Sequence, residues 1–186
     1  MTLLETLLKG AGSSALTEIA KNFNLDGDQA SAVVKQLAPV LARGITKNTQ
    51  DASGLEGLMK ALQSGNHERY LDDPSRLATE QGIQDGNGIL GHLLGSKDVS
   101  REVAKRAAAS TGVSDGIIKQ MLPMVAGMVM GSLRKQQRSE PNFADALNGG
   151  SSTGAAGGLL ASFLDADKDG SVVDDLLGLA GRLLRR

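Results

Sequence analysis

Residues 117–133 read IIKQMLPMVAGMVMGSL, and this stretch decides the fold. A single stripe at helical spacing is formed by Val113, Ile117, Met121, Val125, Val129 and Leu133, and Met124, Met128 and Met130 make the other faces apolar too. A helix that is apolar on nearly every face lies in the centre of a protein or in an interface. Its strongly apolar part, 121–133, is shorter than the roughly 17–25 residues of a membrane-spanning helix. We therefore expect a buried helix and no membrane insertion.

The composition favours an all-α protein with an aliphatic core. The 186 residues include no Trp, one Tyr and three Phe, so Ala, Leu, Val, Ile and Met must fill the interior. Lys plus Arg number 20 against 21 Asp plus Glu, so no overall basic excess attracts nucleic acid. Cysteine is absent, which excludes disulfides. The first residues, MTLLETLLKGAG, carry Glu5 within their apolar part and no preceding basic residue, so we expect no signal peptide and a cytoplasmic protein.

An internal repeat accompanies the apolar helix. The stretch at about 18–43 aligns without a gap on the stretch at about 102–127: EIAK falls on EVAK, VVKQ on IIKQ, and Pro39 on Pro123. Each copy predicts a short helix, a turn and a longer helix with a kink at the proline inside it. We expect a multihelical body made of two pseudo-repeated helical units.

Local signals place the remaining elements. Asp26 and Gln29 fit a capping box at the start of the first long helix. A helix is expected over 54–63, a helix start at Asp73 and Pro74, and a short helix over 87–94 ended by Gly95.

The composition changes after the second copy and suggests a division of the chain. NGGSSTGAAGG, residues 148–158, is typical of a flexible linker. It separates a helical body, 1–147, from an acidic loop and an amphipathic C-terminal helix, 159–186.

Two segments carry a family resemblance. The stretch that runs from SGNHERYLDDP through GNGILGHLLGSKDVSREVAKRAAASTG to MVMGSL, together with DADKDGSVVDDLLGLAGRLL near the C-terminus, resembles the bacterial YidB-like family, domain of unknown function number 937. The resemblance implies a bacterial helical protein without an assigned activity or catalytic residues.

The C-terminal stretch also resembles the calcium loop of an EF-hand. Such a loop takes ligands from positions 1, 3, 5, 7, 9 and 12, with Gly at position 6. Candidate ligands are Asp165, Asp167, Asp169, the backbone carbonyl of Ser171, and Asp175, while Gly170 occupies position 6. Position 12 is Leu176 rather than Glu, so Asp175 would have to reach the ion from one position early. The sequence predicts weak Ca²⁺ binding, with Kd on the order of 10⁻⁵–10⁻³ M.

A structural interpretation of the same stretch stays open. Ser171 and Asp174 form a capping-box pattern, and acidic residues favour a helix N-terminus. One broad apolar face follows at Val172, Val173, Leu176, Leu177, Leu179, Ala180, Leu183 and Leu184. This interpretation does not explain three alternating aspartates, because their like charges repel in a turn.

Two further patterns have both a functional interpretation and a simpler one as helix packing. GNGILG, with Gly86, Gly88 and Gly91, lacks the flanking strands of a dinucleotide site, and we expect a helix start and close helix contacts there. Residues 16–37 have a helix-turn-helix rhythm, but Asp26 and Asp28 open the second helix and would repel phosphates.

The two histidines do not predict a catalytic site. We expect His92 to be partly buried and hydrogen-bonded, and His67 to lie in a polar loop.

These features favour a non-enzymatic protein that acts through protein–protein contacts. Its apolar helix faces suit self-association or another protein partner. The alternative is a helix-turn-helix DNA-binding regulator. Apart from Ca²⁺, no cofactor is expected, since GNGILG lacks the context of a dinucleotide site, and we identify no nucleophile–base pair that would make an enzyme.

Overall fold

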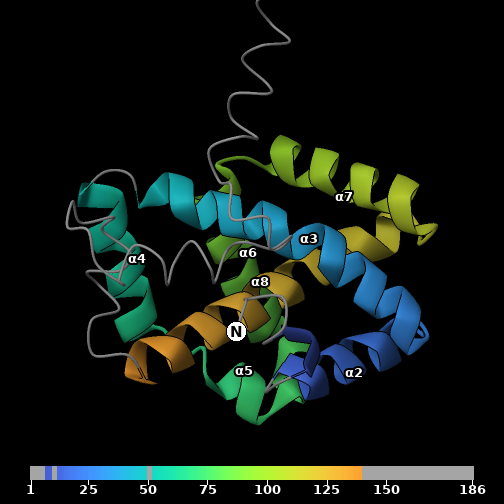
Figure 1. Cartoon of the computed structure of the whole chain (residues 1–186), viewed down its shortest axis with the longest axis horizontal. Helices are drawn as coiled ribbons and strands as arrows, with labels where there is room; N and C mark the ends of the chain where they lie inside the picture. The colour runs from blue at the N-terminus through green and yellow to red at the C-terminus, as the bar shows by residue number, and fades with distance from the viewer. Residues whose placement is uncertain (1–6, 10–11, 50–51, 140–186) are drawn as a thin grey trace, which may run out of the picture.

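The computed structural model describes residues 7–9, 12–49 and 52–139, and within these residues the protein is all-α, as predicted. The described elements are α2 (Gly12–Asn22), α3 (Gly27–Asn48), α4 (Ala52–Ser64), α5 (Arg69–Asp72), the 3₁₀ helix η1 (Pro74–Ala78), α6 (Glu80–Leu94), α7 (Lys97–Thr111) and α8 (Asp115–Ser139). In Figure 1, α3 and α7 lie along one side of the body, α2 and α5 lie along the other, and α8 passes between them.

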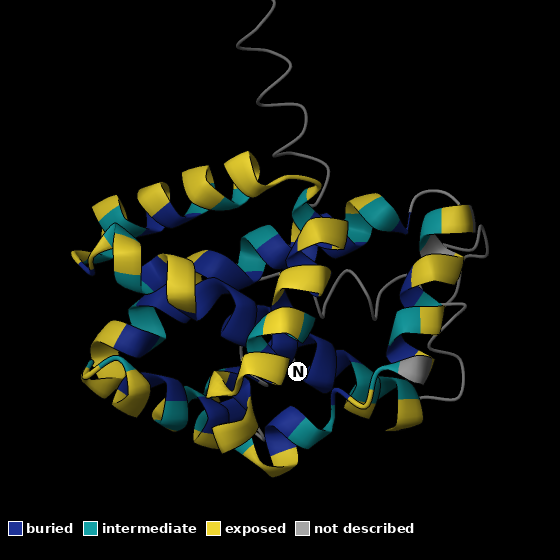
Figure 2. Cartoon of the chain, turned by 180° about the vertical axis from the view of Figure 1, so that it is seen from behind, coloured by how far each residue is buried: buried dark blue, intermediate teal, exposed yellow. Residues whose placement is uncertain are grey.

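Helix α8 is the centre of the fold. It contacts each of the other described helices. Every residue from 121 to 133 is buried, so the helix that the sequence predicted to be buried is covered by its own chain. By length and composition α8 could cross a membrane, but 78 % of its most apolar stretch is buried inside the protein. Figure 2 shows the same arrangement, with buried ribbon in the middle and exposed ribbon on the outer helix faces.

Glycines allow two neighbouring segments to approach α8 at backbone distance. A Cβ atom on Gly86 of α6 would lie 2.1 Å from the carbonyl oxygen of Pro123. A Cβ atom on Gly131 of α8 would lie 2.7 Å from the carbonyl oxygen of His67. No real side chain tolerates such distances, so these two positions require glycine for the observed packing.

The predicted helix termini are largely confirmed. Asp26 and Gln29 form both hydrogen bonds of a capping box, with the Gln29 backbone N–H donating to Asp26 Oδ1 at 2.7 Å. Gly95 ends α6 in the left-handed conformation, with φ of 77°. The expected start of this helix at residue 87 is wrong, because α6 begins at Glu80, where the Thr79 hydroxyl accepts from the Gly82 backbone N–H.

The glycine-rich GNGILG stretch lies inside α6 rather than at a helix start. Gly86 makes the close contact with α8 that we expected, whereas a Cβ atom on Gly88 or Gly91 would meet open space. Only one of the three glycines is therefore required by packing.

Both repeat copies fall on a shorter helix followed by a longer one. The first copy covers parts of α2 and α3, and the second covers parts of α7 and α8. Pro39 and Pro123 both lie inside their long helices. The duplication, the domain limits at 147 and 158 and the linker stay predictions, and the segment from residue 140 onward lies outside the described residues.

Candidate functional site

A partly buried polar cluster joins α5 to α6. Tyr70, the single tyrosine of the chain, is 1 % exposed. Its hydroxyl donates to the carboxylate of Asp85 and accepts from Arg69 Nη2 at 2.9 Å. Arg69 also pairs with Asp85 at 2.6 Å, and Gln81 donates to the other carboxylate oxygen at 2.9 Å. Asp85 therefore accepts from three different side chains.

Two short helical segments create this geometry. Arg69 and Tyr70 are neighbours on the single turn of α5, and the Arg69 guanidinium carbon lies 4.9 Å from the centre of the Tyr70 ring. Gln81 and Asp85 stand four residues apart on α6 and share one helix face. The η1 segment between them reverses the chain, so that a carboxylate from α6 meets an arginine and a tyrosine from α5.

The cluster holds its acid ionised and its phenol protonated. Burial alone raises the pKa of Asp85, but hydrogen bonds from Tyr70, Gln81 and Arg69 outweigh it, and the pKa lies below its usual value. Burial and the hydrogen bond to Asp85 raise the pKa of Tyr70. Both shifts make proton transfer harder near neutral pH, which suits an anchor between helices better than an acid–base pair.

His67 lies beside this cluster, in the turn between α4 and α5 as expected from the sequence, but it is buried there. It is 8 % exposed, and its ring centre lies 6.2 Å from that of Tyr70. Burial is the main reason that its pKa lies below 6.5, with the Arg69 charge acting in the same direction and Asp85 and the Ala61 carbonyl opposing them. The imidazole Nδ1 has no hydrogen-bond partner among the described residues.

His92 is exposed, so the expectation that it is partly buried and hydrogen-bonded is wrong. It stands on the solvent side of α6, between the buried Leu90 and Leu93. His67, in contrast, is held between Gly65 and Gly131, two positions where a side chain would collide with it. The sequence did not predict which of the two histidines is buried, because the burial of His67 depends in part on Gly131, which is distant in the chain.

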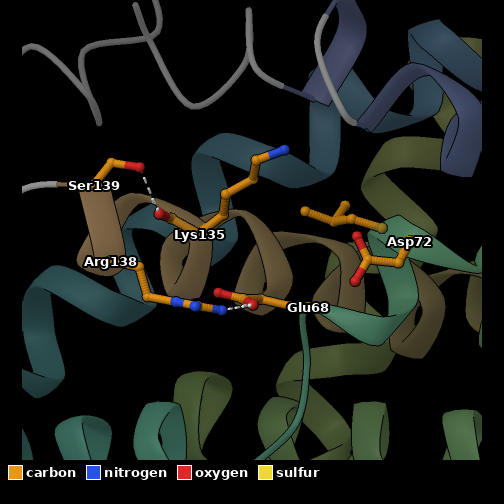
Figure 3. A pocket seen from close by; sticks show the side chains of 6 residues that line it. Glu68, Asp72, Lys135, Arg138 and Ser139 are labelled. Carbon is orange, nitrogen blue, oxygen red and sulfur yellow. Dashed lines mark hydrogen bonds and ion pairs between the residues drawn. The ribbon is translucent and has the colours of Figure 1, made fainter.

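A small hollow opens between α5 and the end of α8. It has a volume of about 250 Å³ and is lined by Glu68, Leu71, Asp72, Lys135, Arg138 and Ser139. Arg138 donates to Glu68 Oε2 at 2.8 Å across one side, and the labelled side chains of Lys135 and Asp72 stand further along it (Figure 3). Ligand pockets for small molecules usually span about 300–1,000 Å³, so this hollow lies below their lower limit.

The predicted cation ligands, Asp165, Asp167, Asp169, Ser171 and Asp175, lie outside the described residues. Within 7–9, 12–49 and 52–139, no three His, Asp or Glu side chains gather closely enough to hold a metal ion.

The helix-turn-helix rhythm of residues 16–37 corresponds to α2, a turn and α3. The Asp26 carboxylate caps the N-terminus of α3, and the exposed Asp28 follows it in the first turn. Lys35, Arg43 and Lys47 are the exposed cations of this helix, and all three stand beyond its first turn. An acidic helix start is unfavourable for insertion next to phosphates.

Sequence reasoning missed the cluster of Arg69, Tyr70 and Asp85. The adjacent Arg and the single Tyr were a usable signal, since a tyrosine in a core almost without aromatic rings needs a partner for its hydroxyl. Asp85 carried no local signal, because only the turn through η1 brings it to Tyr70.

The described residues form an all-α protein built around one buried helix, α8. The partly buried ionisable residues Arg69, Tyr70 and Asp85 are bonded to one another. Within that class, the chain belongs to the family described as "Bacterial protein of unknown function (DUF937)", whose model matches residues 5–136. The match confirms the resemblance derived from the sequence. No curated protein and no solved structure matches the chain.

Proposed function

We propose that this protein is a non-enzymatic interaction module, in which the helical body carries a C-terminal binding segment, residues 159–186. The observation that supports the proposal is the burial of apolar side chains in the body. Among the residues whose exposure the structure describes, Val99, at 45 %, is the one large apolar side chain that is exposed. Helix α8, the other candidate for an apolar contact surface, is already covered.

The binding segment carries an apolar stripe of its own. Val172, Leu176, Leu179 and Leu183 follow a spacing of four, three and four residues, the repeat of helices that pack against one another. A helix of about 14 residues is marginal in water unless its apolar face is covered. A second copy of the same segment supplies a matching face, so self-association is the favoured outcome.

The molar mass of the full chain in solution tests this proposal. We expect light scattering to show a mass above that of the monomer at micromolar concentration. Replacement of Leu176 and Leu179 by Asp in one variant should return the protein to monomer. Val99→Asp is the matched control, since it makes the same change at an exposed apolar side chain of the body, and it should leave the mass unchanged. A wild-type protein that is monomeric throughout excludes self-association.

The same segment is proposed to bind Ca²⁺ weakly through Asp165, Asp167, Asp169, the Ser171 carbonyl and Asp175. Alternating carboxylates beside Gly170 support this assignment, and the missing glutamate at position 12 accounts for the low affinity. Calorimetric titration should give heat at Ca²⁺ concentrations on the order of 10⁻⁵–10⁻³ M for the wild type and none for Asp167→Ala. Absence of heat from the wild type removes the ion from the proposal.

DNA binding through α2 and α3 is the weaker alternative. It predicts retardation of a DNA duplex at about 50 mM salt that weakens steeply as salt is added. Asp28→Lys should strengthen such binding if α3 approaches phosphates, and should change nothing if α3 only packs.

A further inference from the structure

The connection that leads from α4 into α5, residues 65–69, holds buried polar atoms without partners. Among the described residues, four side-chain polar atoms are buried and make no hydrogen bond. Three of the four belong to consecutive residues of this connection, as His67 Nδ1, Glu68 Oε1 and Arg69 Nε. Buried polar atoms are nearly always hydrogen-bonded, so this concentration lowers the stability of the connection. Opening of the connection would let water reach all three atoms.

The imidazole of His67 lies between the two helices that this connection joins. On the α4 side, a Cβ atom on Gly65 would collide with Nε2, and the Ala61 carbonyl accepts a hydrogen bond from the ring. On the α5 side, the ring stacks on that of Tyr70. Because Nδ1 has no partner, the nitrogen that donates to Ala61 is Nε2. Protonation would add a second N–H, at Nδ1, where no described residue accepts it, and a buried unpaired donor is costly.

The carboxylates beside this ring are already paired with arginines. The charged and titratable groups that face the ring are Arg69 and Tyr70 on α5 and Asp85 on α6. Asp85 pairs with Arg69, and the adjacent Glu68 pairs with Arg138 of α8. The charged residues next to the contacts that α4 and α8 make with this connection are cations, Lys60 beside Ala61 and Arg134 one turn beyond Gly131. Within the described residues, a protonated imidazole would therefore meet cations and paired carboxylates.

Helix α4 is the side of this connection that can move. The cluster around Asp85 ties α5 to α6, whereas α4 stands at one end of the body and has its main contacts with α8 and α3 (Figure 1). Leu58 and Leu62 of α4 are buried in the common core, and Met59 Sδ lies 4.0 Å from Gln137 Nε2 of α8. An element with few buried contacts opens at a lower free energy than the rest of a protein.

We propose that residues 65–69 form an acid-sensitive hinge: protonation of His67 releases α4 from α8, while the other helices of the body stay folded. The released helix would expose Leu58 and Leu62, which are covered near neutral pH. Burial lowers the pKa of His67 below 6.5, so the open form binds the proton more readily than the closed form. Opening is therefore favoured as the pH falls below about 6.5. This inference does not depend on self-association or on Ca²⁺.

Hydrogen exchange of the full-length wild-type chain at pH 7 and pH 5, corrected for the intrinsic exchange rates, tests the hinge. We expect the protection of residues 52–64 to fall on the order of tenfold more than that of α3 and α8. The reason is that a pKa that differs by about one between the closed and open forms changes the opening equilibrium about tenfold. An equal fall in all helices would indicate unfolding of the whole body and overturns the hinge. Protection of α4 that is the same at both pH values also overturns it.

Two histidine variants separate this imidazole from other effects of acid. In His67→Gln, the ratio of α4 protection at pH 7 to that at pH 5 should approach the ratio for α3, because glutamine does not titrate. In His92→Gln, which changes the other, exposed histidine, the ratio should stay as in the wild type. A His67→Gln protein in which α4 still opens on acidification contradicts the proposal.

Fluorescence gives a readout that leaves His67 in place. The chain has no tryptophan, so Met59→Trp puts a single indole at a half-buried position of α4. Leu16→Trp is the matched control, at a half-buried position of α2. Between pH 7 and pH 5 we expect the emission of Met59→Trp to shift to longer wavelength and that of Leu16→Trp to stay unchanged. The same shift in both variants, or no shift in Met59→Trp, overturns the hinge.

Discussion

The carbonyl oxygen of Pro123 lies 2.1 Å from the place where a Cβ atom on Gly86 would stand. Helices α6 and α8 therefore touch backbone to backbone at one point of the core. Pro123 lies inside α8 and is itself buried. The residue on α6 must be glycine for the two helices to stay at this distance.

Gly86→Ala and Gly88→Ala make the same chemical change at two positions of one helix. We expect Gly86→Ala to destabilise the protein by about 1–3 kcal/mol, because α6 must move away from α8. Gly88→Ala meets open space and should stabilise it by about 0.5–1 kcal/mol through helix propensity. Denaturant unfolding measures both. Equal effects of the two substitutions would show that the close contact is not needed.

Tyr70→Phe removes one hydroxyl from the cluster and keeps the buried ring. Asp85 loses a donor and Arg69 an acceptor, so the free energy of unfolding should fall by about 1–3 kcal/mol. Arg101→Gln breaks the exposed ion pair with Asp98 and should have little effect, since such pairs contribute little. Urea midpoints compare the two variants, and a Tyr70→Phe protein as stable as the wild type would mean that the hydroxyl contacts are dispensable.

The tyrosine can be titrated directly, because there is only one. Burial and Asp85 hold the pKa of Tyr70 above its usual value of 10.0 in the folded protein. The folded state thus keeps the proton more tightly than the unfolded state, and stability is present below pH 10 and lost as pH rises through the folded pKa. Absorbance of tyrosinate should appear above pH 10 and coincide with loss of helical signal. In Asp85→Asn the absorbance should appear at lower pH, because the carboxylate that raises the pKa is gone.

His67 predicts a second pH dependence on the acid side. Burial lowers its pKa below 6.5, so the unfolded chain binds the proton more readily. The contribution of His67 to the free energy of unfolding should be fully present above about pH 6.5, and it should be lost as the pH falls through the pKa of the folded state. The groups that face this imidazole are Asp85 on α6 and Arg69 and Tyr70 on α5.

The chain's two histidines provide the control for that dependence. In His67→Gln the slope of stability between about pH 7 and pH 5 should flatten. In His92→Gln, where the side chain is exposed, the slope should stay as in the wild type. Thermal unfolding at several pH values measures both, and a flat wild-type profile would contradict the prediction.

The sequence alone determined the helical class, the central helix and several helix ends. These features are local, because a helix depends on spacing of 3.6 residues and its ends depend on side chains within one turn, such as Asp26 with Gln29 and Gly95. The burial of α8 also followed from its own pattern, since an apolar surface on every face has to be covered. Only the tertiary structure decided that its own chain covers it.

Tertiary structure alone decided the burial of His67, the exposure of His92 and the meeting of Tyr70 with Asp85. Each depends on residues distant in the chain: Gly131 makes room for the His67 backbone, and the turn through η1 brings α6 to α5. No local spacing encodes such contacts, because they arise when helices that formed separately pack against one another. The sequence therefore determined which helices form, and packing decided which of their polar groups meet.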